Sequence, residues 1–213
     1  MIANLFLSSI HRYLALPGVL MVTMLLGACG TNYPSVPQTE RFDPTDYNYV
    51  IGPGDNIEIF VWGQPELTGN SIVRPDGKVT TRLVEDMQAS GRTPTELARE
   101  IEETYSLYVR DPIVSVIVRG FVGVPEQQVS VIGEATSPRT VPYSQYMTLL
   151  DLMVAVGGMT EFAAGNRSVL VRVEDGQYRS YGLRLDDLLK DGDISANMAL
   201  RPGDIVIITE SWF

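Results

Sequence analysis

A turn followed directly by a short apolar strand occurs at two distant places in this chain of 213 residues, and it constrains the fold more than any other feature. Gly-Pro-Gly-Asp at residues 52–55 precedes a β-rich run at 57–62, and Arg-Pro-Gly-Asp at 201–204 precedes the run 205–208. In both turns proline fixes φ at the first corner and glycine supplies a positive φ at the second. We expect one turn to open a first domain and the other to close a second.

The elements of the first domain follow from turn and capping residues. Two β-prone runs, 71–73 and 79–81, flank Pro-Asp-Gly at residues 75–77 and predict a hairpin. Thr93 as the N-cap, followed by Pro94 and by Glu96 at the third helical position, predicts a helix with a capping box.

The buried side of that helix and the next strand also follow from the spacing of apolar residues. Leu97, Ile101 and Tyr105 recur every four residues and define one buried helix face. Residues 113–118 predict a strand that is partly buried on both of its faces.

The second domain starts after a stretch rich in glycine and proline at residues 120–126. Thr148, with Asp151 at the third helical position, predicts a helix that ends at Gly157 and Gly158. The same kind of pattern predicts the remaining elements: strands at 128–132, around Val141, at 168–173, 177–183 and 205–208, and a short helix at 185–190. The chain is therefore predicted to be α+β, with a small α+β domain at 47–122 and a β-grasp-like domain at 123–213.

The N-terminal residues have the pattern of a secretory signal. Arg12 is the one charged side chain before Cys29, and the apolar run that follows Arg12 is shorter than the ~20 residues of a spanning helix. The run ends in Leu26, Gly27, Ala28 and Cys29, which resembles a bacterial lipoprotein signal. That resemblance implies a signal peptide at 1–28, cleavage before Cys29 and acylation of its sulfur. An ordinary signal or anchor helix with an incidental cysteine is the alternative.

Residues 29–46 contain Pro34, Pro37 and Pro44 with little periodic apolar content, which predicts a tether between lipid and folded domain. The residue after the cysteine is Gly30 rather than aspartate, and in Gram-negative lipoproteins that pattern implies sorting to the outer membrane. We therefore expect a protein held by lipid on the periplasmic side of the outer membrane.

Missing residue types exclude most kinds of chemistry. Cleavage would remove His11, the one histidine of the chain, and acylation would consume the one cysteine. Catalysis by Ser-His-Asp or Cys-His groups and histidine-ligated zinc are thereby excluded. No phosphate-binding glycine loop or dinucleotide fingerprint is present, and a net charge of −10 disfavours nucleic acid as a partner. We expect no enzyme activity, no cofactor and no metal.

Weaker candidates remain among the aromatic and acidic residues. Stacking on sugar rings is one role for exposed aromatic residues, although core or subunit contact is favoured for Trp62, Tyr47, Tyr49, Tyr143, Tyr146 and Trp212. Arg74 and Asp76 either line a lumen or serve turn geometry. Calcium is a faint alternative for Asp186, Asp187, Asp191 and Asp193, whose spacing does not match a calcium-binding loop. A carboxylate-based glycan hydrolase is a further alternative, but no spacing nominates its acid and nucleophile.

Several motifs, in order, resemble the Wza-type polysaccharide export lipoprotein family. The first module of that family, the polysaccharide export domain, is matched by residues 49–55, 61–62, 65–67, 73–77 and 108–112. The second, the SLBB (soluble-ligand-binding β-grasp) domain, is matched by residues 131–134, 147–151, 157–158 and 202–204. The ending at 210–213 further resembles the short exopolysaccharide subgroup linked to exosortase-type gene clusters.

The resemblance implies a homo-oligomeric ring of lipoproteins that conducts polysaccharide from the periplasm to the cell exterior. It also implies an inner-membrane polysaccharide co-polymerase as a partner. Some members end in an amphipathic helix that spans the outer membrane, whereas this chain stops shortly after its last predicted strand. We therefore expect a periplasmic ring and leave open a separate outer-membrane pore. The alternative is a non-conducting glycan-binding or adaptor module, and the ligand-binding residues stay unknown.

Overall fold

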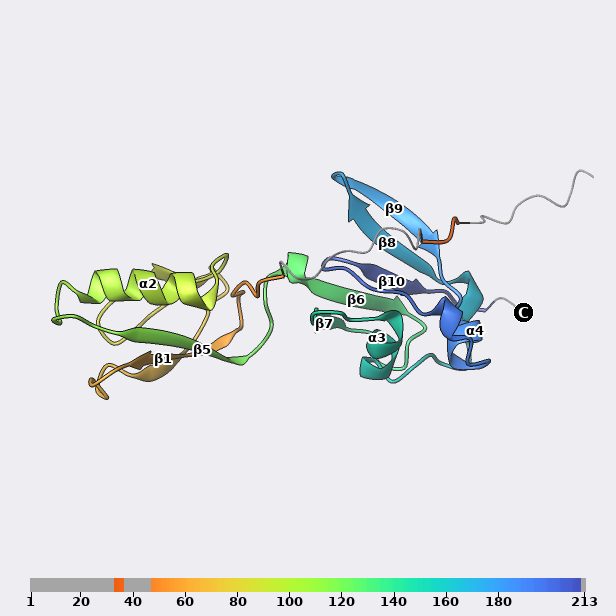
Figure 1. Cartoon of the computed structure of the whole chain (residues 1–213). Coiled ribbons are helices and arrows are strands. Elements are labelled where there is room, and N and C mark those ends of the chain that lie inside the picture. Colours follow the sequence, from red (N-terminus) through yellow and green to blue (C-terminus); the bar gives the residue numbers. More distant parts are fainter. Residues whose placement is uncertain (1–32, 37–46, 212–213) are drawn as a thin grey trace, which may run out of the picture. The chain divides into compact units, whose positions relative to one another are not determined.

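The computed structural model of the chain describes residues 33–36 and 47–211. The predicted signal peptide, Cys29 and Trp212 lie outside the described residues, as does most of the predicted tether. Buried side chains gather in two separate hydrophobic clusters, one formed by residues 51–114 and the other by residues 129–208. The first cluster packs on a three-stranded sheet and on the two-stranded sheet of β3 (Lys78–Val79) and β4 (Met87–Gln88), and the second packs on a five-stranded sheet. Strands of the two larger sheets are labelled in Figure 1.

The first sheet has three antiparallel strands in the order β2-β1-β5. They are β1 (Asn56–Val61), β2 (Gly69–Ile72) and β5 (Val114–Gly120). The helix α2 (Pro94–Tyr105) runs along β5 in Figure 1. Apolar residues of α2, β1 and β5 share one hydrophobic cluster, so α2 covers one face of this sheet.

The helix α2 begins and packs as its sequence predicts. The Thr93 side chain accepts a hydrogen bond from the Glu96 backbone N–H, and the Glu96 carboxylate accepts one from the Thr93 N–H. Leu97, Ile101 and Tyr105 have no exposed surface, which confirms the predicted buried face. Burying a side chain of this size contributes roughly 1.5–3 kcal/mol, so the face stabilises the module strongly.

The predicted hairpin of residues 71–73 and 79–81 is wrong in its pairing. The turn itself forms, since the Gly77 N–H donates to the Arg74 carbonyl at 2.8 Å. However, β2 pairs with β1, and β3 (Lys78–Val79) pairs with β4 (Met87–Gln88). The physical reason is a competing partner: the Gly77 carbonyl accepts hydrogen bonds from the backbone of Ala89 and Ser90.

The predicted burial of residues 113–118 on both faces is also wrong. Val114 is buried in the cluster with α2, and Val116 and Val118 pack against it. Ile113 and Ile117 alternate with these valines and are exposed. Successive side chains of a strand point to opposite faces, so the second face of β5 carries apolar residues without being covered.

The second sheet has five strands in the order β7-β6-β10-β8-β9. Its central pair, β6 (Gln128–Gly133) and β10 (Ile205–Ile208), is parallel, and the other neighbours are antiparallel. The remaining elements are β7 (Thr140–Pro142), β8 (Val169–Glu174), β9 (Gln177–Gly182), α3 (Leu149–Ala155), α4 (Leu185–Leu189), and the 3₁₀ turns η2 (Pro125–Gln127), η3 (Gly165–Arg167) and η4 (Ile194–Ala196).

The second module also follows its predicted capping signals. Thr148 and Asp151 form a capping box at the start of α3, and Gly157 and Gly158 adopt positive φ after its end. The predicted apolar side of α3 is buried in the hydrophobic cluster of the second module, through Leu149, Leu152, Met153 and Val156. The predicted α+β class, with a β-grasp-like second module, is confirmed.

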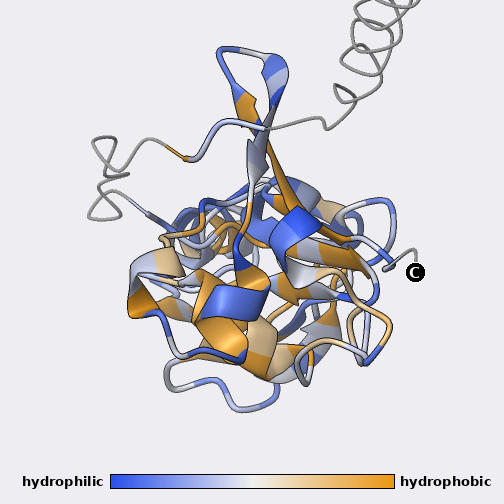
Figure 2. Cartoon of the chain, turned by 90° about the vertical axis from the view of Figure 1, so that its right-hand side faces the viewer, coloured by the Kyte–Doolittle hydropathy of each residue, from blue (hydrophilic) through white to orange (hydrophobic). Residues whose placement is uncertain are grey.

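The β8–β9 hairpin projects from the rest of its module in Figure 1, and its tip is hydrophilic in Figure 2. The tip residues Asp175 and Gly176 both have positive φ. At the other end of β9, the Gly182 N–H donates to the Pro34 carbonyl at 3.0 Å. Among the described residues, no helix is both long enough and apolar enough to cross a membrane.

Candidate functional site

Asp55, the last residue of the first Pro-Gly-Asp turn, is fully buried and accepts four hydrogen bonds. One carboxylate oxygen accepts from the Gly52 N–H at 2.9 Å and the Tyr49 hydroxyl at 2.6 Å. The other accepts from the backbone N–H groups of Val122 at 2.6 Å and Gly123 at 2.9 Å. Burial and the hydrogen bond to this carboxylate raise the pKa of Tyr49. Asp55 thus fastens the start of the first sheet to the segment that follows β5.

The backbone at this point allows no larger residue in place of Gly52. A Cβ atom on Gly52 would lie 1.9 Å from the carbonyl oxygen of Gly123. The turn therefore needs glycine for close approach as well as aspartate for its carboxylate.

Gln127 and Tyr47 add contacts between residues 47–50 and the start of the second module. The Gln127 side chain accepts from the Val50 N–H at 2.9 Å and donates to the Asn48 carbonyl at 2.8 Å. The Tyr47 ring meets the Tyr143 ring edge-on, with centroids 5.1 Å apart. Burial raises the pKa of both tyrosines. Tyr47, Tyr49 and Tyr143 are therefore packing residues, as the favoured interpretation of the sequence holds.

Asp204, in the second Pro-Gly-Asp turn, is buried against Arg172 of β8. The Arg172 guanidinium donates to both carboxylate oxygens, at 2.8 and 2.6 Å, and the Arg201 N–H donates to one of them at 2.8 Å. Arg172 also donates to the Ala199 carbonyl at 3.3 Å. A buried bidentate pair of this kind fixes geometry, and it joins the closing turn to β8.

An apolar surface covers the face of the first sheet opposite α2. Trp62 is 69% exposed, and its ring lies against that of Phe60, with centroids 6.4 Å apart. Ile113 is exposed next to Trp62, whose N–H donates to the Ile113 carbonyl, and Ile72 and Ile117 are exposed further along the same face, opposite Asn56 and Glu58. We call these five residues the open sheet face. The ion pair of Glu58 and Arg119 lies on the same face, so the open sheet face combines exposed apolar residues with charge, as a surface that contacts another protein does.

A polar cavity of about 270 Å³ lies beside the edge strand β2. Its apolar lining comes from Ile59 and Leu67, and its polar lining consists of Asn70, Ser71, Thr80, Thr81 and Arg82. The Arg82 guanidinium lies over Gly69, where a Cβ atom would be 3.2 Å from its Nε. Hydroxyl, amide and guanidinium groups above apolar atoms suit the hydroxyls and carboxylates of sugars. No sequence pattern pointed to this cavity, because its two sides come from segments whose pairing was predicted wrongly.

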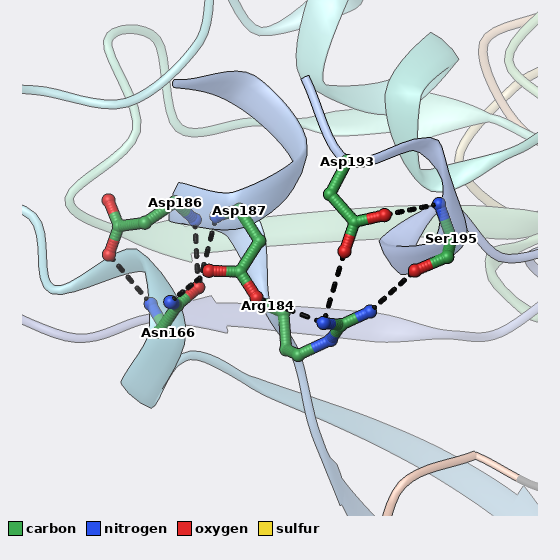
Figure 3. Close-up of polar contacts among 6 residues, drawn as sticks. All are labelled: Asn166, Arg184, Asp186, Asp187, Asp193 and Ser195. Carbon is green, nitrogen blue, oxygen red and sulfur yellow. Dashed lines mark hydrogen bonds and ion pairs between the residues drawn. The ribbon is translucent and has the colours of Figure 1, made fainter. Parts of the chain in front are cut away.

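The acidic cluster near α4 consists of Asp186, Asp187 and Asp193, whose carboxylates bind neighbouring side chains and backbone groups of the protein (Figure 3). Asn166 donates through its side chain to Asp187 at 2.6 Å and through its backbone to Asp186 at 2.9 Å. Arg184 pairs with Asp187 at 3.0 Å and with Asp193 at 3.2 Å. Hydrogen bonds from the Ser195 hydroxyl and N–H lower the pKa of Asp193. Within residues 33–36 and 47–211, no three metal-binding side chains gather in a way that would hold an ion.

Both modules match families of known proteins. Residues 43–119 match the family described as polysaccharide biosynthesis/export protein, and residues 127–208 match the SLBB domain. The chain belongs to the Wza-type polysaccharide export family. This membership confirms the resemblance noted from the motifs, and the family is one of export proteins rather than enzymes.

Two relatives of this export-family chain are named EPS I polysaccharide export outer membrane protein EpsA. The protein from Ralstonia nicotianae (strain ATCC BAA-1114 / GMI1000) is 26% identical over 186 residues, which cover 76% of this chain. The protein from Ralstonia solanacearum is 28% identical over 182 residues, which cover 74% of it. The matched region is 47% of the length of each relative, so the chain spans about half of them.

Arg74, Asp76 and Tyr146 were also singled out in the sequence. Arg74 pairs with Asp76 and with Asp86 at the turn before β3, which supports a role in turn geometry. Tyr146 is exposed in a left-handed conformation, with φ of 66°. The open sheet face, apart from Trp62, was missed, although the alternation of residues in β5 carried a signal for it.

Proposed function

We propose that this export-family chain is an outer-membrane-associated lipoprotein of an exopolysaccharide or capsule export machine. Subunits form a periplasmic ring that conducts polysaccharide across the cell envelope. The order of an export module followed by an SLBB module is the observation that carries the proposal. The two relatives, named as polysaccharide export outer membrane proteins, support the same role and location.

The proposal assigns a part to each region of the chain. Residues 1–28 form the signal peptide, Cys29 carries the lipid, and residues 29–46 lead to the folded modules at 47–122 and 123–213. The proposed partner is an inner-membrane polysaccharide co-polymerase. The open sheet face supports assembly, because subunit contact would remove Trp62, Ile72 and Ile113 from water.

A deletion strain tests export. Deleting the gene should leave polymer synthesis intact and abolish polymer at the cell surface, with polymer retained inside the envelope. Complementation by the intact gene should restore surface polymer, and a Cys29→Ser gene should not. Normal surface polymer in the deletion strain would refute the proposal.

A non-conducting glycan-binding module is the second candidate, and the polar cavity around Arg82 is the observation that favours it. Electron microscopy of lipidated protein extracted in detergent separates the two. A closed ring with an open lumen supports conduction. A monomer that binds the exported glycan, and loses that binding when Arg82 is replaced by Ala, supports the second candidate.

A further inference from the structure

Four residues of the predicted tether are packed against the second module instead of leading freely to the first. We call residues 33–36 the docked segment. The Pro34 carbonyl accepts the hydrogen bond from Gly182 at the end of β9, and Val36 packs against the hydrophobic cluster of the second module. In Figure 1 the docked segment is the red-orange stretch beside β9. A free linker would make none of these contacts.

The place of the docked segment in the chain limits how far the second module can lie from the lipid. Tyr33 follows Cys29 by four residues. A fully extended chain spans at most about 3.6 Å per residue, so Tyr33 lies within about 14 Å of the acylated residue. The full predicted tether would instead allow several times that distance.

We propose that the lipid on Cys29 holds the second module at the membrane surface through the short connection from Cys29 to Tyr33. Residues 37–46 then connect the membrane-bound second module to the first module. The proposal rests on the proposed acylation of Cys29. Its partner is a lipid surface, and the docked segment, rather than the length of the tether, decides which module contacts it.

The end of the second sheet that faces the lipid follows from the strand register. Gly182 pairs with Val169, and Val169 pairs with Ile207, so β9 and β10 end on the same side of the sheet where β8 begins. Beyond β10, the Ala164 N–H donates to the Thr209 carbonyl at 2.8 Å, which brings the neighbouring exposed residue Glu161 to this side. We therefore expect Glu161 to lie near the bilayer.

Gly182 is the residue that permits docking. A Cβ atom there would lie 3.3 Å from the Tyr33 carbonyl oxygen and 3.7 Å from the Tyr33 Cβ, so a branched side chain would displace the docked segment. Gly182 has no positive φ, and valine suits a strand, so Gly182→Val should leave β9 itself intact. Gln177→Val is the matched control, because Gln177 is exposed at the opposite end of the same strand.

Fluorescence quenching in vesicles tests the proposal with the full acylated protein. A dye is attached to Glu161→Cys in the second module or to Glu66→Cys in the first, and the vesicles carry lipids with a nitroxide headgroup. Because acylation blocks Cys29, the introduced thiol is the one that reacts. We expect at least twofold stronger quenching at residue 161 than at residue 66. Gly182→Val should reduce that difference, and Gln177→Val should keep it.

A second variant tests the proposal in case Gly182→Val does not fold. Inserting ten Gly and Ser residues between Asn32 and Tyr33 lengthens the connection to Cys29 without changing any residue of the folded modules. It should also reduce quenching at residue 161. Equal quenching at both positions, or stronger quenching at residue 66, overturns the proposal. Mass spectrometry of the N-terminal peptide distinguishes failure of the proposed function from failure of this inference. An unmodified Cys29 overturns the lipoprotein function as well. Acylated protein with equal quenching at both positions overturns this inference alone.

Discussion

The two Pro-Gly-Asp turns place aspartates in similar local sequence but in different surroundings. Asp55 is buried among backbone N–H groups and the Tyr49 hydroxyl, whereas Asp204 is buried against the guanidinium of Arg172. Dipoles satisfy the first carboxylate and a full positive charge satisfies the second. The same short motif therefore fixes the turn but does not determine how its buried carboxylate is stabilised.

Removing the carboxylate of Asp204 should have the largest effect of the changes considered. Asp204→Ala leaves the buried Arg172 without its partner, and breaking a buried ion pair in this way costs about 3–5 kcal/mol. Urea unfolding of the detergent-solubilised protein measures this loss. A double variant, Arg172→Met with Asp204→Leu, should recover much of the stability, because no charge is then left buried. A double variant as unstable as Asp204→Ala would show that the pair contributes geometry that apolar residues cannot replace.

Asp55→Asn should cost less, about 2–3 kcal/mol. With the amide NH₂ in place of the oxygen that faces Gly52 and Tyr49, the Gly52 N–H loses its acceptor, whereas the Tyr49 hydroxyl can rotate to accept from the NH₂. One hydrogen bond to a charged group contributes about 1.5–3 kcal/mol, and the bonds from Val122 and Gly123 then reach an uncharged oxygen. No buried cation is left unpaired, which is why the loss is smaller than for Asp204. Hydrogen exchange should become faster at the amides of Val122 and Gly123. Glu66→Gln, an exposed change in the same module, should leave both measurements unchanged.

Tyr49→Phe tests the hydroxyl that donates to Asp55, and its effect should depend on pH. At neutral pH the loss of one hydrogen bond to a carboxylate should cost about 1.5 kcal/mol. The pKa of Tyr49 is raised in the folded protein above its ordinary value of 10.0. Its stabilising contribution is therefore complete below about pH 10 and is lost as the pH rises above that value.

The difference in unfolding free energy between wild type and Tyr49→Phe should accordingly stay constant from neutral pH to about pH 9 and shrink above pH 10. Tyr178→Phe is the control, because the Tyr178 side chain is exposed on β9, away from Asp55. A difference that grows above pH 10 would contradict the assigned contact.

The sequence predicted those parts of the fold that depend on local contacts. The capping boxes of Thr93 and Thr148 satisfy backbone groups within three residues, so their helices could be located from the sequence alone. The partner of β2 could not be located in this way. The Pro-Asp-Gly turn forms as predicted, but Ala89 and Ser90, more than ten residues away, decide which strands pair after it.

The same limit applies to the candidate site. The partners of Asp55 include Val122 and Gly123, and Asp204 meets Arg172, so the buried role of each aspartate depends on residues far away in the sequence. The docked segment is a sharper example. Pro34 and the prolines that follow it predict a linker, and nothing in the composition of the docked segment indicates that Pro34 meets Gly182.

The aspartates near α4 are partly exposed, unlike the buried Asp55 and Asp204. Changing their surroundings should have the smallest effect on stability. Asp187 and Asp193 share Arg184 at a partly exposed site, and the remaining donors are Asn166 and Ser195. Since these groups already occupy the carboxylate oxygens, calcium has no vacant set of ligands to bind. We expect the melting midpoint in excess calcium chloride and in excess EDTA to agree within about 1 °C, because a ligand that does not bind the folded state cannot stabilise it. Asp187→Asn should cost at most about 1 kcal/mol, as is usual for solvent-screened pairs. A midpoint several degrees higher in calcium, lost in Asp187→Asn, would instead identify the cluster as a cation site.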